Sequence, residues 1–104
     1  MRKRRFEILL PLKLNDGRRV DDDLIYLTRE ELVAKFGAVT VNPNTVLRFW
    51  VYERARYEDE LLRFVIDVDD TEDNLLFFSE FKSTLLERYQ QIEIYMASYP
   101  IDLH

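Results

Sequence analysis

The stretch that decides the fold is TVLRFWVYERARYEDELLRFVIDV, residues 45–68. Aromatic and β-branched residues dominate positions 45–54, and apolar residues return through positions 61–68. Residues of this kind favour strands, and two such runs in succession indicate a β-hairpin. A shorter β-rich run over residues 39–41 comes before it, and Asn42-Pro43-Asn44 interrupts the two. We therefore expect two long strands in the middle of the chain.

The residues before the hairpin predict a strand and then a helix. Apolar side chains alternate from Phe6 to Leu14, which is the period of a strand, and Pro11 within it needs a position where no backbone N–H is required. Further on, Thr28-Arg29-Glu30-Glu31 has the form of a capping box. We expect the first helix to begin there, with residues 22–27 able to add turns, and to end at Gly37.

The residues after the hairpin predict a second helix and a final strand. Helical spacing from about Glu72 to Tyr89 gives an aromatic inner face, made of Phe77, Phe78, Phe81, Leu85 and Tyr89. The acidic run 67–73 lies where this helix starts, so we interpret it as helix capping rather than as a magnesium site. A last strand is expected from Ile92 to about Tyr99, before Pro100.

The order of these elements predicts the fold class. Strand, helix, strand, strand, helix, strand in a chain of 104 residues indicates an α+β protein of ferredoxin-like βαββαβ type. Such a fold has a four-stranded antiparallel sheet with both helices on one face, and right-handed crossovers place the first and third strands at its centre. We expect a single domain over residues 1–104.

Composition excludes many kinds of active site. The chain has no Cys, one His at position 104 and two Gly that lie 20 positions apart, which argues against thiolate metal sites, Ser–His triads and Gly-rich phosphate loops. No metal and no cofactor is expected. The net charge of -5 disfavours binding to duplex nucleic acid. No apolar signal segment follows the basic residues 2–5 and no run could span a bilayer, so we expect a cytoplasmic protein with no membrane partner.

Strand parity predicts an unusual second face of the sheet. If Leu47, Phe49 and Val51 point into the helix-covered core, then Arg48, Trp50 and Tyr52 must point away from it. The same parity adds residues from the other strands, and the hairpin turn adds more. The candidate ligand-binding residues are Arg48, Trp50, Tyr52, Arg54, Arg56, Tyr57, Arg63, Tyr95 and Tyr99.

Two interpretations of this face remain open. A large apolar face favours a homodimer in which two sheets pack face to face, with the arginines paired to Glu7, Glu53 or Glu93. The same residues could stack a nucleotide or another flat anionic ligand. We expect a dimeric module that binds a small ligand or a protein through this face and the 52–60 hairpin, rather than an enzyme. The alternative is a metal-independent phosphodiesterase or nuclease that acts in a dimer cleft.

The chain also resembles a family of small bacterial proteins of ferredoxin-like fold. The resemblance rests on Ile8–Leu12 with Asn15-Asp16-Gly17, on Glu31-Leu32-Val33 with Phe36-Gly37, and on Tyr57–Val68, Tyr89–Ile94 and Ser98–Ile101. It implies the same fold. Because no activity is established for the family, the resemblance implies no catalytic residue.

Overall fold

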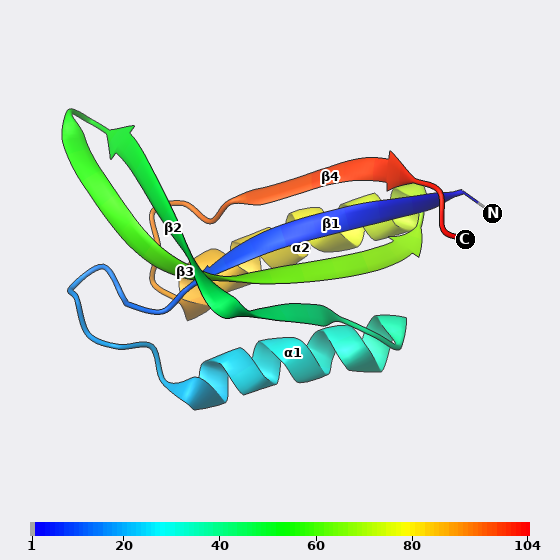
Figure 1. Ribbon diagram of the computed structural model, residues 1–104, viewed down its shortest axis with the longest axis horizontal. Coiled ribbons are helices and arrows are strands. Elements are labelled where there is room, and N and C mark those ends of the chain that lie inside the picture. Colours follow the sequence, from blue (N-terminus) through cyan, green and yellow to red (C-terminus); the bar gives the residue numbers. More distant parts are fainter. Residues whose placement is uncertain (1) are drawn as a thin grey trace.

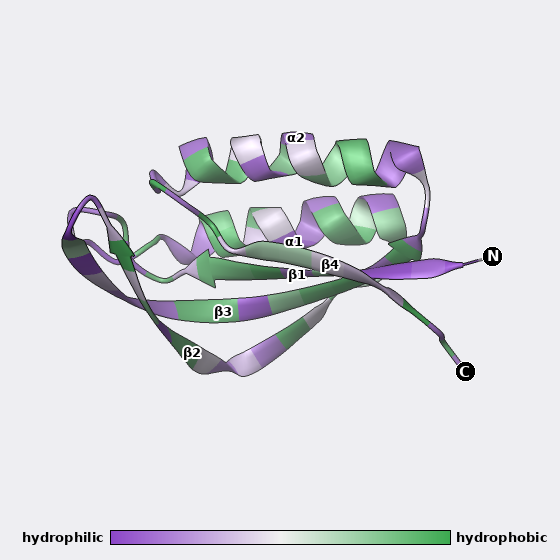
Figure 2. Ribbon diagram, turned by 90° about the horizontal axis from the view of Figure 1, so that it is seen from above, coloured by the Kyte–Doolittle hydropathy of each residue, from purple (hydrophilic) through white to green (hydrophobic). Residues whose placement is uncertain are grey.

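The computed structural model describes residues 2–104, and its six elements follow the predicted order (Figure 1). They are the strands β1 (Lys3–Pro11), β2 (Thr40–Tyr52), β3 (Ala55–Asp69) and β4 (Met96–Ile101), and the helices α1 (Asp22–Phe36) and α2 (Glu72–Arg88). The strands form one antiparallel sheet in the order β2-β3-β1-β4. Both helices lie on the same face of this sheet (Figure 2). The ferredoxin-like α+β fold, with the first and third strands at the centre, is therefore confirmed.

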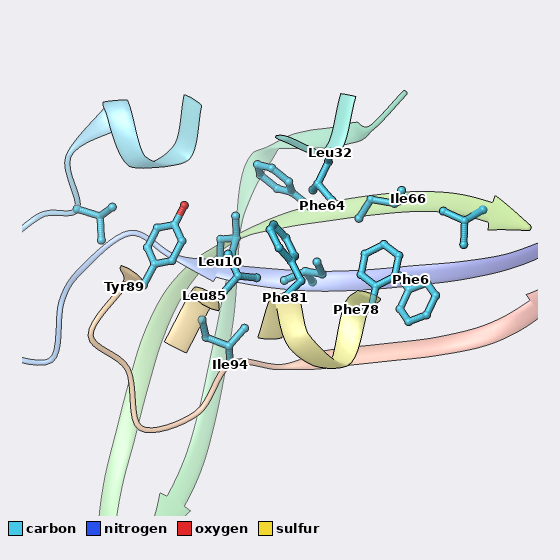
Figure 3. Packing of buried hydrophobic residues seen from close by; sticks show 13 residues of the cluster. Phe6, Leu10, Leu32, Phe64, Ile66, Phe78, Phe81, Leu85, Tyr89 and Ile94 are labelled. Carbon is cyan, nitrogen blue, oxygen red and sulfur yellow. The ribbon is translucent and has the colours of Figure 1, made fainter. Parts of the chain in front are cut away.

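The core lies between the sheet and the two helices. Side chains from the two central strands meet Phe78, Phe81 and Leu85 of the second helix, all of them buried (Figure 3). Phe6 and Phe78 stack with ring centroids 3.8 Å apart. Thr71 caps α2, because its side chain accepts a hydrogen bond from the Asn74 backbone N–H at 3.2 Å. The predicted aromatic inner face is confirmed. The acidic run supplies Glu72 and Asp73 to the first turn, but the N-cap itself is Thr71.

The first helix begins earlier than the capping-box motif predicts. Asp21 is the N-cap and accepts a hydrogen bond from the Asp23 backbone N–H, whereas Thr28 lies two turns inside the helix and is fully buried. Leu24 and Ile25 pack against the core, so tertiary contacts extend the helix back through residues 22–27. The Gly37 cap is confirmed, with a φ of 85° that suits glycine.

The last strand begins and ends later than the alternation predicts. β4 pairs with β1 from Met96 to Ile101, and residues 92–95 lie outside it. Pro100 does not end the strand, because β4 is at the sheet edge and every second residue of an edge strand turns its N–H position to solvent. Pro11 is likewise tolerated at the end of β1, beyond the reach of β4.

The central hairpin extends past the helices. At about 3.3 Å per residue, β2 and β3 have contour lengths of about 43 and 50 Å, whereas α1 and α2 at about 1.5 Å per residue have lengths of about 22 and 26 Å. The part of the hairpin beyond the helices, residues 46–60, is called the hairpin arm below (Figure 1). It projects from the body of the sheet as a two-stranded ribbon (Figure 2).

The prediction that Leu47, Phe49 and Val51 lie in the core is wrong. These side chains are 57%, 54% and 69% exposed, the highest values of any large apolar residues in the strands. The parity is right, because they point to the helix side of the sheet, but no helix reaches that far. The arm therefore carries an uncovered apolar stripe.

Two irregularities shape the arm. The pairing of β2 with β3 shifts register between Asn42 and Val46, where the sequence predicts an interruption. At the tip, Tyr52 pairs with Ala55 across the two-residue turn Glu53-Arg54. Both turn residues have positive φ, 48° and 67°, as a type I′ hairpin turn requires.

Candidate binding face

Most of the basic residues at the start of the chain are neutralised within the fold. Lys3 binds Asp69, Arg4 binds Asp70 at 2.8 Å, and Arg5 makes two hydrogen bonds to Asp67 at 2.7 and 3.0 Å. The antiparallel register of β1 and β3 brings the two runs together, with Lys3 opposite Asp69. The acidic run therefore serves as a partner for the basic run as well as a helix start.

A second charged group occupies the middle of the helix-free face. Arg63 on β3 pairs with Glu7 on β1, and the Tyr99 hydroxyl of β4 donates to the same carboxylate at 2.9 Å. The hydrogen bond from Arg63 lowers the pKa of Glu7, and the bond from Tyr99 adds to this effect. Arg63 is therefore paired with Glu7 within one copy of the chain.

The arm end of the helix-free face holds an aromatic cluster, defined here as Trp50, Tyr52, Tyr57 and Tyr95. Trp50 and Tyr57 are directly opposite on β2 and β3, and their rings stack with centroids 4.6 Å apart. The Trp50 indole N–H donates to Asp59 at 2.6 Å, which fixes the orientation of the ring. Tyr52 lies beside it, 6.3 Å away and tilted.

Arg48 lies between the Trp50 ring on β2 and the Tyr95 ring near the opposite edge of the sheet. Its guanidinium carbon lies 5.9 Å from the Trp50 ring centroid and 5.1 Å from that of Tyr95, within the range of cation–π attraction. Strands β3 and β1 separate β2 from the segment that carries Tyr95, a distance of about 14 Å in a flat sheet. The sheet therefore curls toward its helix-free side at this end. Leu61 supports this, since it is only 5% exposed although no helix covers its face.

Arg48 differs from Arg5 and Arg63, the other strand arginines of the helix-free face, because no carboxylate holds it. Within residues 2–104, no ion pair shorter than 4.0 Å includes Arg48, although it is partly buried. The acid directly opposite Arg48 on β3 is Asp59, which accepts the hydrogen bond from the Trp50 indole N–H. The charge of Arg48 also lowers the pKa of Glu93 slightly, whereas the main cause of that lowering is a hydrogen bond from Lys82 at 2.8 Å. Arg48 thus presents a positive charge between aromatic rings, free to hold an anion.

The structure brings together some of the predicted site residues and separates others. Arg48 and the aromatic cluster meet at the arm end, and Arg63 and Tyr99 lie further along the same face with Glu7. Arg54 sits in the turn at the tip. Arg56 pairs with Val51 and so points to the opposite face of the arm, outside this group.

A hollow adjoins the aromatic cluster where β1 ends and the arm begins. It has a volume of about 360 Å³, and its lining includes Lys13, Tyr57, Asp59, Glu60 and Gln91. The Gln91 side chain donates to the carbonyl oxygens of Lys13 and Tyr89 at 3.1 and 2.9 Å, which ties this corner together. Asp59 and Gln91 are absent from the predicted set, although Asp59 shares the parity of Tyr57 and could have been found that way.

Residues 2–104 contain no group of three or more His, Asp or Glu side chains placed to hold a metal ion. No helix in that range is both long and apolar enough to cross a membrane.

Comparison with known protein families finds no matching family model, and comparison with curated proteins finds no significant match. The resemblance to a bacterial family therefore stays a prediction, and the site has to be interpreted from its own geometry.

Proposed function

We propose that the protein is a homodimeric binding module that holds a flat, negatively charged ligand against Arg48 and the aromatic cluster. The observation that carries this proposal is the state of Arg48, a partly buried guanidinium that touches two aromatic rings and forms no ion pair within residues 2–104. Elsewhere on this face the arginines are already matched by carboxylates.

The chemistry of the cluster favours a ligand that combines a ring system with an anion. An exposed aromatic edge offers a stacking surface, and base–aromatic stacking contributes about 1–3 kcal/mol per base. A guanidinium offers paired N–H donors that match phosphate or carboxylate. Tyr95 is 39% exposed and Tyr52 is 43% exposed, so both rings remain accessible beside Arg48. A nucleotide has both features.

The single tryptophan of the chain provides the measurement, because Trp50 fluorescence reports on this cluster alone. We expect ATP, GTP or a cyclic dinucleotide to quench it in a saturable way, and adenosine, which lacks the anion, to bind more weakly. Saturable quenching that is equal for adenosine and ATP would remove the role given to Arg48.

A matched pair of variants locates the site. Arg48→Gln should weaken nucleotide binding by a factor of about 10 to 150, since hydrogen bonds to charged groups contribute about 1.5–3 kcal/mol. Arg56→Gln makes the same chemical change on the opposite face of the arm and should alter binding less than twofold. An equal loss in both variants would place the ligand elsewhere. Analysis of the nucleotide after incubation tests the phosphodiesterase alternative, which predicts hydrolysis products.

A further inference from the structure

We propose that two copies of the chain associate by antiparallel pairing of their β2 strands, with Phe49 opposite Phe49 of the second copy. This inference rests on the homodimer of the proposed function and gives it a location. It replaces the face-to-face packing of sheets with an edge-to-edge pairing that continues the sheet across the two molecules.

The first observation is the open edge of the arm. β2 is the outermost strand of the sheet, and its arm portion, residues 46–52, contains one charged residue, Arg48, and neither Pro nor Gly. Proteins that stay monomeric protect such edges with charges, prolines or bulges. Here the bulge and Pro43 lie before residue 46, and the rest of the strand is unprotected.

The backbone pattern determines which groups are available for pairing. A two-residue turn closes on a pair that exchanges both of its hydrogen bonds, and this pair is Tyr52 and Ala55. Hydrogen-bonded pairs then alternate along the ladder. The N–H and C=O groups of Leu47, Phe49 and Val51 consequently point away from β3, toward the open edge.

A twofold axis through Phe49 satisfies all of these groups. It places Phe49 opposite its own copy and Leu47 opposite Val51 of the second copy, so that three hydrogen-bonded pairs form. The paired segment 46–52 is symmetric about position 49, and it fills the straight part of the strand between the register shift and the turn.

Charge disfavours the neighbouring register whose axis passes through Arg48. Residues that pair across the axis must point to the same face of the sheet, so they are an even number of positions apart in the sequence. The twofold axis therefore passes between the two copies of one residue. An axis through Arg48 would set two guanidinium groups directly opposite each other, which is destabilising. The axis through Phe49 sets Arg48 opposite Trp50 of the second copy instead, a pair that attracts.

The apolar stripe favours a second copy as the occupant rather than an unrelated strand. Leu47, Phe49 and Val51 are more than half exposed, and the pairing lays three such side chains beside three identical ones on one face. The sequence of the strand therefore complements itself in hydrogen bonding, charge and apolar contact together.

Cysteine cross-linking tests the register, since the chain has no cysteine of its own. Val46 and Tyr52 of opposite copies form a non-hydrogen-bonded pair, with Cα atoms about 4.5 Å apart and within disulfide range. An equimolar mixture of Val46→Cys and Tyr52→Cys should form a disulfide-linked dimer on mild oxidation. Neither variant alone should do so. In this register residue 46 of one copy lies six positions along the strands from residue 46 of the other, and the same holds for residue 52. If either variant alone forms a disulfide-linked dimer, or if the mixture forms none, the proposed register is wrong.

Light scattering after size exclusion tests the association itself. The wild-type chain should have twice the 12.6 kDa mass of one copy at micromolar concentrations. Phe49→Lys should be a monomer, because it places two ammonium groups opposite each other on the axis. Glu58 is the residue of β3 that pairs with Phe49, and it does not lie on the open edge. Glu58→Lys should therefore stay dimeric. A monomeric wild-type chain refutes the proposal.

Nucleotide titration of the same variant separates the two proposals. Phe49 lies on the opposite face of the arm from Arg48, so a folded, monomeric Phe49→Lys should keep saturable quenching of Trp50. Loss of the dimer with retained binding supports both proposals. Absent quenching in a wild-type dimer would contradict the ligand proposal and leave the pairing supported.

Discussion

The hydroxyl groups of Thr28 and Tyr89 lie 2.7 Å apart inside the core, and they join the two helices. Both oxygens are also within hydrogen-bond distance of the Leu24 carbonyl, at 2.9 and 3.0 Å. Arg88 completes the group by donating to Thr28 at 3.0 Å and to Glu31 at 2.6 Å. Every buried side-chain nitrogen and oxygen within residues 2–104 has a hydrogen-bond partner, and this group accounts for the buried threonine.

Tyr89→Phe should lower the free energy of unfolding by about 1 kcal/mol, the usual net contribution of one hydrogen bond. Urea denaturation measures this change. Thr28→Val should lower the free energy of unfolding by more than this. It removes the Thr28 hydroxyl, which is the hydrogen-bond partner of both the Tyr89 hydroxyl and an Arg88 N–H. A Thr28→Val variant as stable as the wild type would show that the group contributes nothing.

Alkaline pH provides a second test of the same tyrosine. Burial raises the pKa of Tyr89 above its ordinary value of 10.0. The unfolded chain therefore ionises this group first, so the stability that it contributes is present below pH 10 and is lost as the pH rises through the higher folded value. Urea midpoints measured from pH 8 upward should fall more steeply for the wild type than for Tyr89→Phe. Parallel curves would contradict the burial of a neutral hydroxyl.

Arg48 and Lys82 should both affect the acidity of Glu93. Lys82→Met should raise the pKa of Glu93, because it removes the hydrogen bond that is the main cause of the lowering. Arg48→Met should raise it by a smaller amount, since Arg48 acts only through its charge. NMR titration of the Glu93 carboxyl measures both shifts. No response to Arg48→Met would mean that the arm does not bend toward β4 in solution.

The turn at the tip of the arm should accept glycine with a gain in stability. Arg54 has a φ of 67°, a conformation that is unfavourable for a residue with a side chain and costs about 1 kcal/mol. Arg54→Gly should relieve this cost and raise the thermal midpoint slightly, whereas Arg54→Val should lower it. If the two variants shift the midpoint in the same direction, the turn does not have this geometry.

Acid should weaken the central ion pair of the helix-free face. Arg63 lowers the pKa of Glu7, so the stability that the pair contributes is present above the ordinary glutamate value near 4.5 and is lost as the pH falls through the lower folded value. When the free energy of unfolding from urea denaturation is plotted against pH, it should fall less steeply over this acidic range for Glu7→Gln and Arg63→Gln than for the wild type. If the free energy of unfolding of both variants depends on pH as steeply as that of the wild type, the ion pair does not contribute to stability.

The sequence predicts the body of this fold well because periodicity determines it. The alternation in Phe6, Ile8 and Leu10 and the helical spacing of Phe78, Phe81 and Leu85 each correspond to a buried face in the structure. These patterns are local, and they hold wherever the strand or helix has a partner to cover it. The capping-box motif at Thr28 fails because a threonine and a glutamate three residues apart also fit the inside of a helix.

The candidate site was harder to predict, because it depends on relations between distant residues. Parity places Leu47 and Phe49 on the helix side, but only the greater length of the strands shows that no helix covers them. Whether an arginine is free depends on register. Arg63 is paired because it lies near Glu7 on the neighbouring strand. Arg48 lies opposite Asp59, but that carboxylate is bound by Trp50, and the guanidinium of Arg48 lies over Tyr95 instead.

The hairpin arm also affects how this protein tolerates mutation. Residues 46–60 contribute no side chain to the buried cluster, so we expect most changes there to alter the packing of the body little. Most residues of the proposed ligand site, Arg48, Trp50, Tyr52 and Tyr57, lie in this arm, apart from the residues that stabilise the body. A library of variants restricted to the arm should consequently yield folded proteins at high frequency, which makes this ribbon a natural place for recognition to diversify.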